Sequence, residues 1–307
     1  MGIIDSLFRR RSGTTMTATA FDAGFIRRLE LLIIAAARAS GSLRYGRRPG
    51  RATGGRLIFQ DYREFAPGDD IRMIDWNVYA RTDRLYVKVY TREENARLTI
   101  LLDSSASMAF GSPSKLDRAK QLAASLAHIA VFSGDSAQIV ILDGSTRSLG
   151  VFHSRDKSAE ILDALDTVEP SGRAGIDDLK IIAARQPQRG SLALISDCWW
   201  DVSRLSELSA LALSLGPAAL IPVLSNDDLN APPPGRWRIA DSETGDDVLV
   251  EGGPDMAEKF RRVVNGRLET LRSFCRSSGI CFAEWLPDAT LEDIVFGSLR
   301  QTGYFEQ

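Results

Sequence analysis

A carboxylate and two hydroxyls alternate in the segment LTILLDSSASM, residues 98–108, directly after an apolar run. Asp103, Ser105 and Ser107 occupy every second position there. Their oxygens are hard ligands, and such a set with open positions suits a small hard cation such as Mg²⁺ or Mn²⁺. Asp and Ser also follow strands because they cap the next helix, so helix capping is the alternative interpretation.

A second carboxylate follows a second apolar run, SLALISD, which ends in Asp197. From residue 98 to residue 302, apolar runs alternate with segments of helical periodicity. This alternation predicts an α/β fold with a mostly parallel sheet that helices cover on both faces. Ligands bind beyond the carboxyl ends of the strands in such sheets. We therefore expect Asp197 to lie beside Asp103.

The elements that position these residues can be placed from periodicity and turn residues. We expect helices near residues 115–133, 157–166, 177–185, 203–215, 255–278 and 290–301. We expect strands near residues 98–102, 137–144, 146–153, 191–197, 218–224 and 280–285, with a hairpin over 235–250.

The N-terminal third has a different character. Residues 1–20 are rich in Arg, Ser, Thr and Gly and predict a flexible tail. Residues 21–97 predict a helix near 21–40, a basic glycine-rich loop and a small β-region, with a strand near 56–65 and another from residue 84 to a turn near residues 93–95. The helix carries an apolar face, which we expect to pack on the same molecule or on a partner.

A loop between these strands interleaves acidic and basic residues. Such residues form charge-assisted pairs, so we interpret the loop as a structural network rather than as a binding site. The residues of this structural loop are Asp69, Asp70, Arg72, Asp75 and Trp76, with Arg63 and Arg81 as further cations. We expect Trp76 and Tyr79 to anchor the loop on the core.

The region from about residue 98 to residue 300 resembles a von Willebrand factor A-like domain, whose metal-ion-dependent adhesion site begins with D-x-S-x-S. The resemblance implies a Rossmann-like three-layer sandwich that holds Mg²⁺ at the top of the sheet through Asp103, Ser105, Ser107 and Asp197. An acidic residue of a partner protein typically completes the coordination. The family's Thr is missing from SGRAGIDDLK, residues 171–180, where Asp177 is the candidate substitute.

Three further segments, PGDDIRMIDW, DSSASM and WRIADSETGDD, resemble the bacterial family known as domain of unknown function fifty-eight. Its members are often encoded beside MoxR-type AAA+ ATPases. The resemblance implies a non-enzymatic protein-binding module, an adaptor that acts with such an ATPase in protein assembly or maturation. The expected partner is the ATPase or its client.

Two other function classes remain open. One is a metal-dependent phosphoryl-transfer or hydrolytic enzyme centred on Asp103, although a haloacid-dehalogenase-type phosphatase needs a second Asp where Ser105 stands.

The other is an adaptor that binds nucleic acid or a membrane surface through a basic arm. The first 100 residues carry 18 Lys and Arg against 11 Asp and Glu, whereas the remainder carries 20 against 29. Nucleic acid is the less favoured ligand because the arm lacks interleaved aromatic residues.

Composition indicates a soluble protein of the cytoplasm. The chain has 307 residues, of which 44% are hydrophobic and 25% are charged. Its longest apolar stretch, residues 29–39, is shorter than the roughly 20 residues that span a bilayer. The three cysteines are odd in number and lack metal-ligand spacing, which is typical of a reducing compartment.

Overall fold

The computed structural model describes residues 20–39, 56–93, 96–174, 176–184, 190–201, 205–240, 247–302 and 304. These residues form two compact units. The larger unit joins the segment up to Gly46 with the chain from Ala96 onward, and the smaller unit spans Arg47–Asn95. The helix near the N-terminus, which we grouped with residues 21–97, thus belongs to the larger unit.

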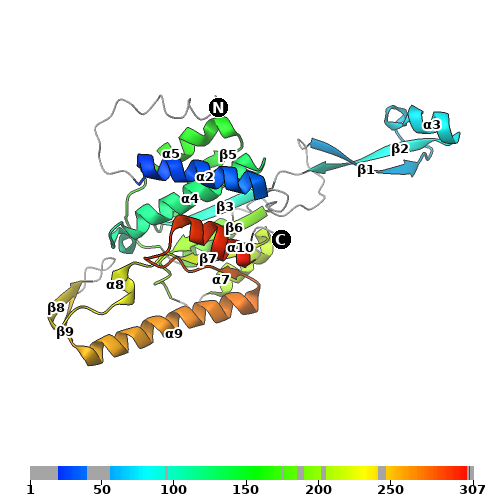
Figure 1. The fold of residues 1–307 in the computed structure, drawn as a ribbon. Coiled ribbons are helices and arrows are strands. Elements are labelled where there is room, and N and C mark those ends of the chain that lie inside the picture. The colour runs from blue at the N-terminus through cyan, green and yellow to red at the C-terminus, as the bar shows by residue number, and fades with distance from the viewer. Residues whose placement is uncertain are drawn as a thin grey trace. The chain divides into compact units, whose positions relative to one another are not determined.

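A six-stranded sheet in the order β10-β7-β6-β3-β4-β5 forms the centre of the larger unit (Figure 1). Every neighbouring pair is parallel except β4 and β5. The strands are β3 (Arg97–Asp103), β4 (Ser136–Leu142), β5 (Arg147–Phe152), β6 (Gly190–Ser196), β7 (Ala218–Pro222) and β10 (Cys281–Phe282). The predicted α/β fold with a mostly parallel sheet is therefore confirmed.

Helices cover both faces of this sheet because the side chains of its central strand alternate between two hydrophobic cores. Leu98, Ile100 and Leu102 point into one core, and Leu101 points into the other. The first core is closed by α2 (Ala23–Ala39), α4 (Lys115–Phe132), α5 (Ser158–Asp166) and the C-terminal segment. The second is closed by α6 (Ile176–Ala184), α7 (Ser206–Leu215) and α9 (Pro254–Ser278) (Figure 1).

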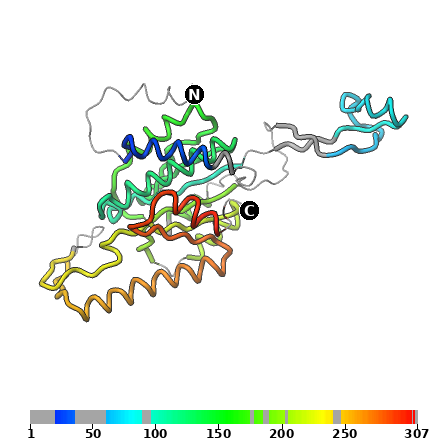
Figure 2. The backbone as a smooth tube through the Cα atoms, in the orientation of Figure 1, coloured from blue at the N-terminus to red at the C-terminus, as the bar shows by residue number. Residues whose placement is uncertain are grey.

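The N-terminal helix packs on its own molecule. Phe25, Leu29 and Leu32 of α2 lie in the first core, each at most 5% exposed. Figure 2 shows the backbone of α2 running close to that of α4, and residues of both helices belong to one core. Of the two expected docking partners for its apolar face, the same molecule is thus the one observed.

Several elements differ from the predicted ones. The last strand, β10, has only two residues, although a single bridge from Val223 to Trp285 prolongs the pairing. The final helix begins near Leu291 and contains a π-helical stretch, Asp293–Ser298. A short helix, α8 (Asn226–Leu229), was not predicted because four residues show no periodicity. The hairpin is β8 (Gly235–Ala240) and β9 (Asp247–Gly252).

The smaller unit is an antiparallel hairpin of β1 (Arg56–Glu64) and β2 (Tyr86–Glu93), with a 3₁₀ turn, Ile71–Met73, and α3 (Trp76–Thr82) between the strands. Trp76 and Tyr79 are 60% and 38% exposed. Their rings pack edge-to-face, with 6.0 Å between the ring centroids. They are therefore not the buried anchors that we expected.

Hydrogen bonds from within the smaller unit fix its polar loop. Asp75 caps α3 by accepting from the amide of Asn77 at 2.9 Å, and it also accepts from the hydroxyl of Tyr62 at 2.9 Å. Its cationic partner is Lys88 at 3.0 Å. Asp69 pairs with Arg63 at 2.6 Å, and Asp70 accepts from the amide of Arg72 at 3.0 Å.

No helix among the described residues is long and apolar enough to cross a membrane.

Candidate metal and partner-binding site

Two neighbouring parallel strands deliver the predicted site residues to one edge of the sheet. Leu102 of β3 pairs with Ile195 of β6, so Asp103 and Ser196 lie side by side where these strands end. The Ser196 hydroxyl donates to Asp103 Oδ2 at 2.5 Å. Asp197 follows immediately, as the chain leaves the sheet. This register places the ends of the two strands side by side, as we expected.

The predicted side chains form two hydrogen-bonded pairs, each of a serine and an aspartate, and the two serine hydroxyls lie in contact. The Ser105 hydroxyl donates to Asp103 Oδ1 at 2.6 Å and lies 3.1 Å from the Ser107 hydroxyl. The Ser107 hydroxyl donates to Asp197 Oδ2 at 2.7 Å. Asp103 and Ser105 are 1% exposed and Asp197 is 4% exposed, whereas Ser107 is half-buried. We call Asp103, Ser105, Ser107 and Asp197 the strand-end site, and Ser107 is its most accessible member.

The two carboxylates of the strand-end site repel each other when both are ionised. Burial, and after it the nearby charge of Asp197, raise the pKa of Asp103, which reaches about 7. Hydrogen bonds from Ser105 and Ser196 oppose the rise. A cation bound between the two carboxylates would relieve their repulsion.

The oxygens of the strand-end site fit a small hard cation. Neighbouring ligands of an octahedral Mg²⁺ lie about 3.0 Å apart, since each Mg–O bond is about 2.1 Å long. The successive oxygen separations here are 2.6, 3.1 and 2.7 Å. No three His, Cys, Asp or Glu side chains gather to hold a metal ion in the described part of the chain. A cation at the strand-end site would therefore depend on the serine hydroxyls as well as on the two carboxylates.

The loop before α6, which precedes the candidate ligand Asp177, lies against the site. The amide of Ser171 donates to the carbonyl of Ser104 at 2.7 Å, and the amide of Ala106 donates to the carbonyl of Gly172 at 3.2 Å. Asp177 falls in the first turn of α6, and its side chain lies outside the described part of the structure. Its neighbour Asp178 is buried and accepts from the hydroxyl of Thr146 at 3.0 Å.

A buried lysine that our sequence analysis did not consider completes the surroundings of Asp197. The Lys115 ammonium lies 2.8 Å from Asp197 Oδ2 and 3.0 Å from Asp228 Oδ1. Burial alone would lower the pKa of Lys115, but the charges of Asp197 and Asp228 outweigh it and raise the pKa. Lys115 is the first residue of α4, where the helix dipole disfavours a cation. A lysine at this unfavourable position was the sequence signal that could have pointed to a buried partner for Lys115.

Asp228 is held in place from several sides. Its Oδ2 accepts from the amide of Ser225 at 2.8 Å and from the hydroxyl of Ser225 at 2.6 Å. The Asp228 amide in turn donates to the Ser225 hydroxyl at 3.4 Å, and the two amide hydrogen bonds form a capping box at the start of α8. Its Oδ1 also accepts from the indole of Trp199 at 3.1 Å. Lys115 thus connects the end of β6 to α8.

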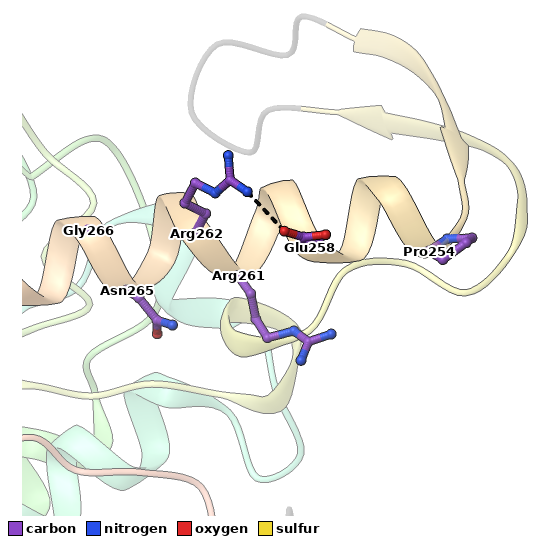
Figure 3. A pocket seen from close by; sticks show the side chains of 6 residues that line it. All are labelled: Pro254, Glu258, Arg261, Arg262, Asn265 and Gly266. Atoms are coloured by element: carbon purple, nitrogen blue, oxygen red, sulfur yellow. Dashed lines mark hydrogen bonds and ion pairs between the residues drawn. The ribbon is translucent and has the colours of Figure 1, made fainter.

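A shallow pocket on the surface of α9 offers no comparable chemistry. It is lined by Pro254, Glu258, Arg261, Arg262, Asn265 and Gly266 (Figure 3). Arg262 is paired with Glu258 at 2.9 Å, and Arg261 and Asn265 point away from that pair. The pocket lining includes none of the strand-end residues, so the strand-end site remains the candidate site.

The model of the family described as "Protein of unknown function DUF58" matches residues 61–267, which include the whole strand-end site. The chain belongs to this family. The DUF58 protein is 28% identical over 250 residues to uncharacterized proteins of Mycobacterium tuberculosis and Mycobacterium bovis, and these matches cover 78% of each chain.

Solved structures with a similar chain trace are more distant from the DUF58 protein. BatB from Bacteroides thetaiotaomicron is 14% identical with a TM-score of 0.42, and the match covers 68% of this chain and 98% of that one. An aerotolerance-related membrane protein from Bacteroides fragilis is 16% identical, with the same TM-score and the same coverage.

Proposed function

We propose that this DUF58 protein is a non-enzymatic protein-binding module of von Willebrand factor A type that acts in the cytoplasm with a MoxR-type AAA+ ATPase. In this proposal Asp103, Ser105, Ser107 and Asp197 hold Mg²⁺ or Mn²⁺, and Asp177 is a further candidate ligand. The bound ion would supply a positive charge that attracts an acidic side chain of the partner. The observation that carries the proposal is the gathering of four oxygen-bearing side chains, two serine–aspartate pairs in mutual contact, at the ends of two adjacent parallel strands.

The surroundings of the site favour a binding role. Ser107 is half-buried, so it lies where an incoming group would reach the site. Two large aromatic side chains flank the site in sequence and are exposed: Phe110 at 50% and Trp199 at 37%. Aromatic residues are enriched at the centres of protein interfaces. All three cysteines are free and buried, in keeping with a reducing compartment.

The contacts of Asp103 argue against its use as a phosphoryl acceptor. One of its oxygens accepts from Ser196 and the other accepts twice from Ser105, through the hydroxyl and through the amide at 2.8 Å. The residue is 1% exposed. A nucleophilic carboxylate needs an oxygen that the substrate can reach. Ser105 and Ser107 donate to carboxylates, and His128 is buried within α4, where its Nδ1 contacts the carbonyl of Ala124 at 2.7 Å.

The proposal is tested by measuring binding to a purified MoxR-type ATPase, with Mg²⁺ or with EDTA. We expect binding with Mg²⁺ and at least a tenfold loss in EDTA or on Ser107→Ala, which removes one ligand at the half-buried mouth. The matched control is Ser104→Ala, because the Ser104 hydroxyl is buried without a hydrogen-bond partner in the described structure. Equal binding by wild type and Ser107→Ala, in both buffers, would contradict the metal-dependent part of the proposal.

A further inference from the structure

The strand-end site already contains a cation. Lys115 contributes an ammonium whose side chain is 3% exposed and which contacts both Asp197 and Asp228 within 3.0 Å. A fully buried charge of this kind persists only where opposite charges surround it. The site is therefore neutralised in part by the protein itself.

Lys115 and the proposed metal ion would share one carboxylate oxygen. Asp197 Oδ2 accepts from the Lys115 ammonium at 2.8 Å and from the Ser107 hydroxyl at 2.7 Å. Asp197 Oδ1 accepts from the amide of Trp199 at 3.2 Å. Both oxygens thus have partners before any metal arrives, so a divalent ion that binds Asp197 must compete with at least one of them.

We propose that Lys115 is the resident cation of the strand-end site and that it sets the affinity of the site for divalent ions. This inference rests on the proposed function, because it concerns the same site. The ammonium holds Asp197 and Asp228 together without a metal, and it repels a divalent ion that takes Asp197. Because both cations would contact Asp197 Oδ2, they would lie no more than about 5 Å apart. At that separation their repulsion weakens divalent binding by about tenfold, even at the dielectric constant of water.

The consequence is a site that retains its ion best when a partner is present. A carboxylate from the partner would restore the negative charge that Lys115 cancels. The isolated protein would then bind Mg²⁺ or Mn²⁺ weakly, although its site would still bind the ion tightly in the complex with the partner.

Charge-balanced variants test the role of Lys115. Lys115→Met keeps the length of the side chain but leaves Asp197 and Asp228 unpaired, so Asp228→Asn is added to remove one of these charges. Lys115→Arg keeps the positive charge and serves as the matched control. The full chain is stripped of metal with EDTA and exchanged into EDTA-free buffer. Mn²⁺ alone is then titrated, with free Mn²⁺ followed by electron paramagnetic resonance.

We expect the Lys115→Met/Asp228→Asn protein to bind Mn²⁺ at least tenfold more tightly than Asp228→Asn alone. We expect Lys115→Arg to bind within about threefold of wild type. Adding Ser107→Ala to either the double variant or Asp228→Asn should abolish Mn²⁺ binding if the ion occupies the strand-end site. If it does, and the double variant and Asp228→Asn still bind Mn²⁺ with equal affinity, the role of Lys115 is overturned and the metal site stands. Absence of Mn²⁺ binding in every variant would instead remove the metal site of the proposed function, and this inference with it.

Discussion

At the scale of single residues, Lys115 joins separate parts of the larger unit. It links Asp197 after β6 with Asp228 of α8, across 82 and 113 positions of sequence. Removing one member of a buried ionic cluster leaves its partners charged and unsolvated, which costs about 3–5 kcal/mol. We therefore expect Lys115→Met to lower the free energy of unfolding by about that amount in EDTA, as measured by urea denaturation.

The double variant provides the control for this loss. Asp228→Asn removes one of the two unpaired carboxylates, so Lys115→Met/Asp228→Asn should recover part of the lost stability. A single variant as stable as wild type would show that Asp197 and Asp228 are solvated well enough without the ammonium.

Asp75 allows a pH prediction that is independent of any metal. Hydrogen bonds from Lys88 and then from Tyr62 lower the pKa of Asp75 to about 2, from an ordinary value near 3.8. Because the folded state holds the ionised form more strongly, its contribution to stability is present above about pH 4 and is lost as the pH falls toward 2. We expect carbon NMR to show the Asp75 carboxyl titrating near pH 2 in wild type. The midpoint should rise in Lys88→Met, and an unchanged midpoint there would contradict the assigned cause.

At the scale of elements, α2 makes a simple comparison possible. Leu32 is 1% exposed in the first core, whereas its neighbour Leu31 is 61% exposed on the same helix. Truncating a buried leucine costs about 2–5 kcal/mol, through lost transfer energy and the cavity left behind. We expect Leu32→Ala to destabilise the protein by this amount and Leu31→Ala to change it by less than about 0.5 kcal/mol. Equal effects in thermal denaturation would mean that α2 does not pack as described.

The loop before α6 shows a second constraint at this scale. A Cβ added to Gly172 would lie 2.3 Å from the carbonyl oxygen of Asp143, and the residue has φ +67°. Gly134 also has positive φ, at +92°, but nothing lies within 4 Å of its Cβ position. Gly134→Ala should therefore cost only the left-handed backbone strain, about 1–2 kcal/mol. Gly172→Ala should cost more in urea denaturation and should also weaken Mn²⁺ binding, because the loop contacts Ser104 and Ala106.

The limits of sequence-based reasoning are visible in these same elements. The apolar runs before Asp103 and Asp197 were sufficient to predict β3 and β6, since a doubly covered parallel sheet requires continuous apolar strands. The D-x-S-x-S spacing then pointed to Asp103, Ser105 and Ser107, and the end of the second apolar run pointed to Asp197. Lys115 and Asp228 were missed because their pairing arises only when α4 and α8 fold against the end of β6. The helix α3 was missed because it has only seven residues and none is buried.

At the scale of the whole molecule, the smaller unit is inserted into the larger one between α2 and β3. Arg56 and Glu93 pair with each other at one end of the hairpin, so the chain enters and leaves this unit at neighbouring points. Both hydrophobic cores of the sheet are built from residues outside 56–93. The larger unit therefore has the buried surface to fold without the hairpin.

We expect a chain in which a short Gly/Ser linker replaces residues 47–95 to remain folded, with a melting temperature within a few degrees of that of the full chain. Its Mn²⁺ affinity should also match, because all residues of the strand-end site and Lys115 lie in the larger unit. Circular dichroism and Mn²⁺ titration measure the two properties separately.

Loss of the cooperative transition would show that the hairpin stabilises the larger unit directly. Retained folding with lost Mn²⁺ binding would show that the hairpin contributes to the site. If both properties are retained, any effect of the deletion on ATPase binding would identify the hairpin, with exposed Trp76 and Tyr79, as a separate contact for the partner.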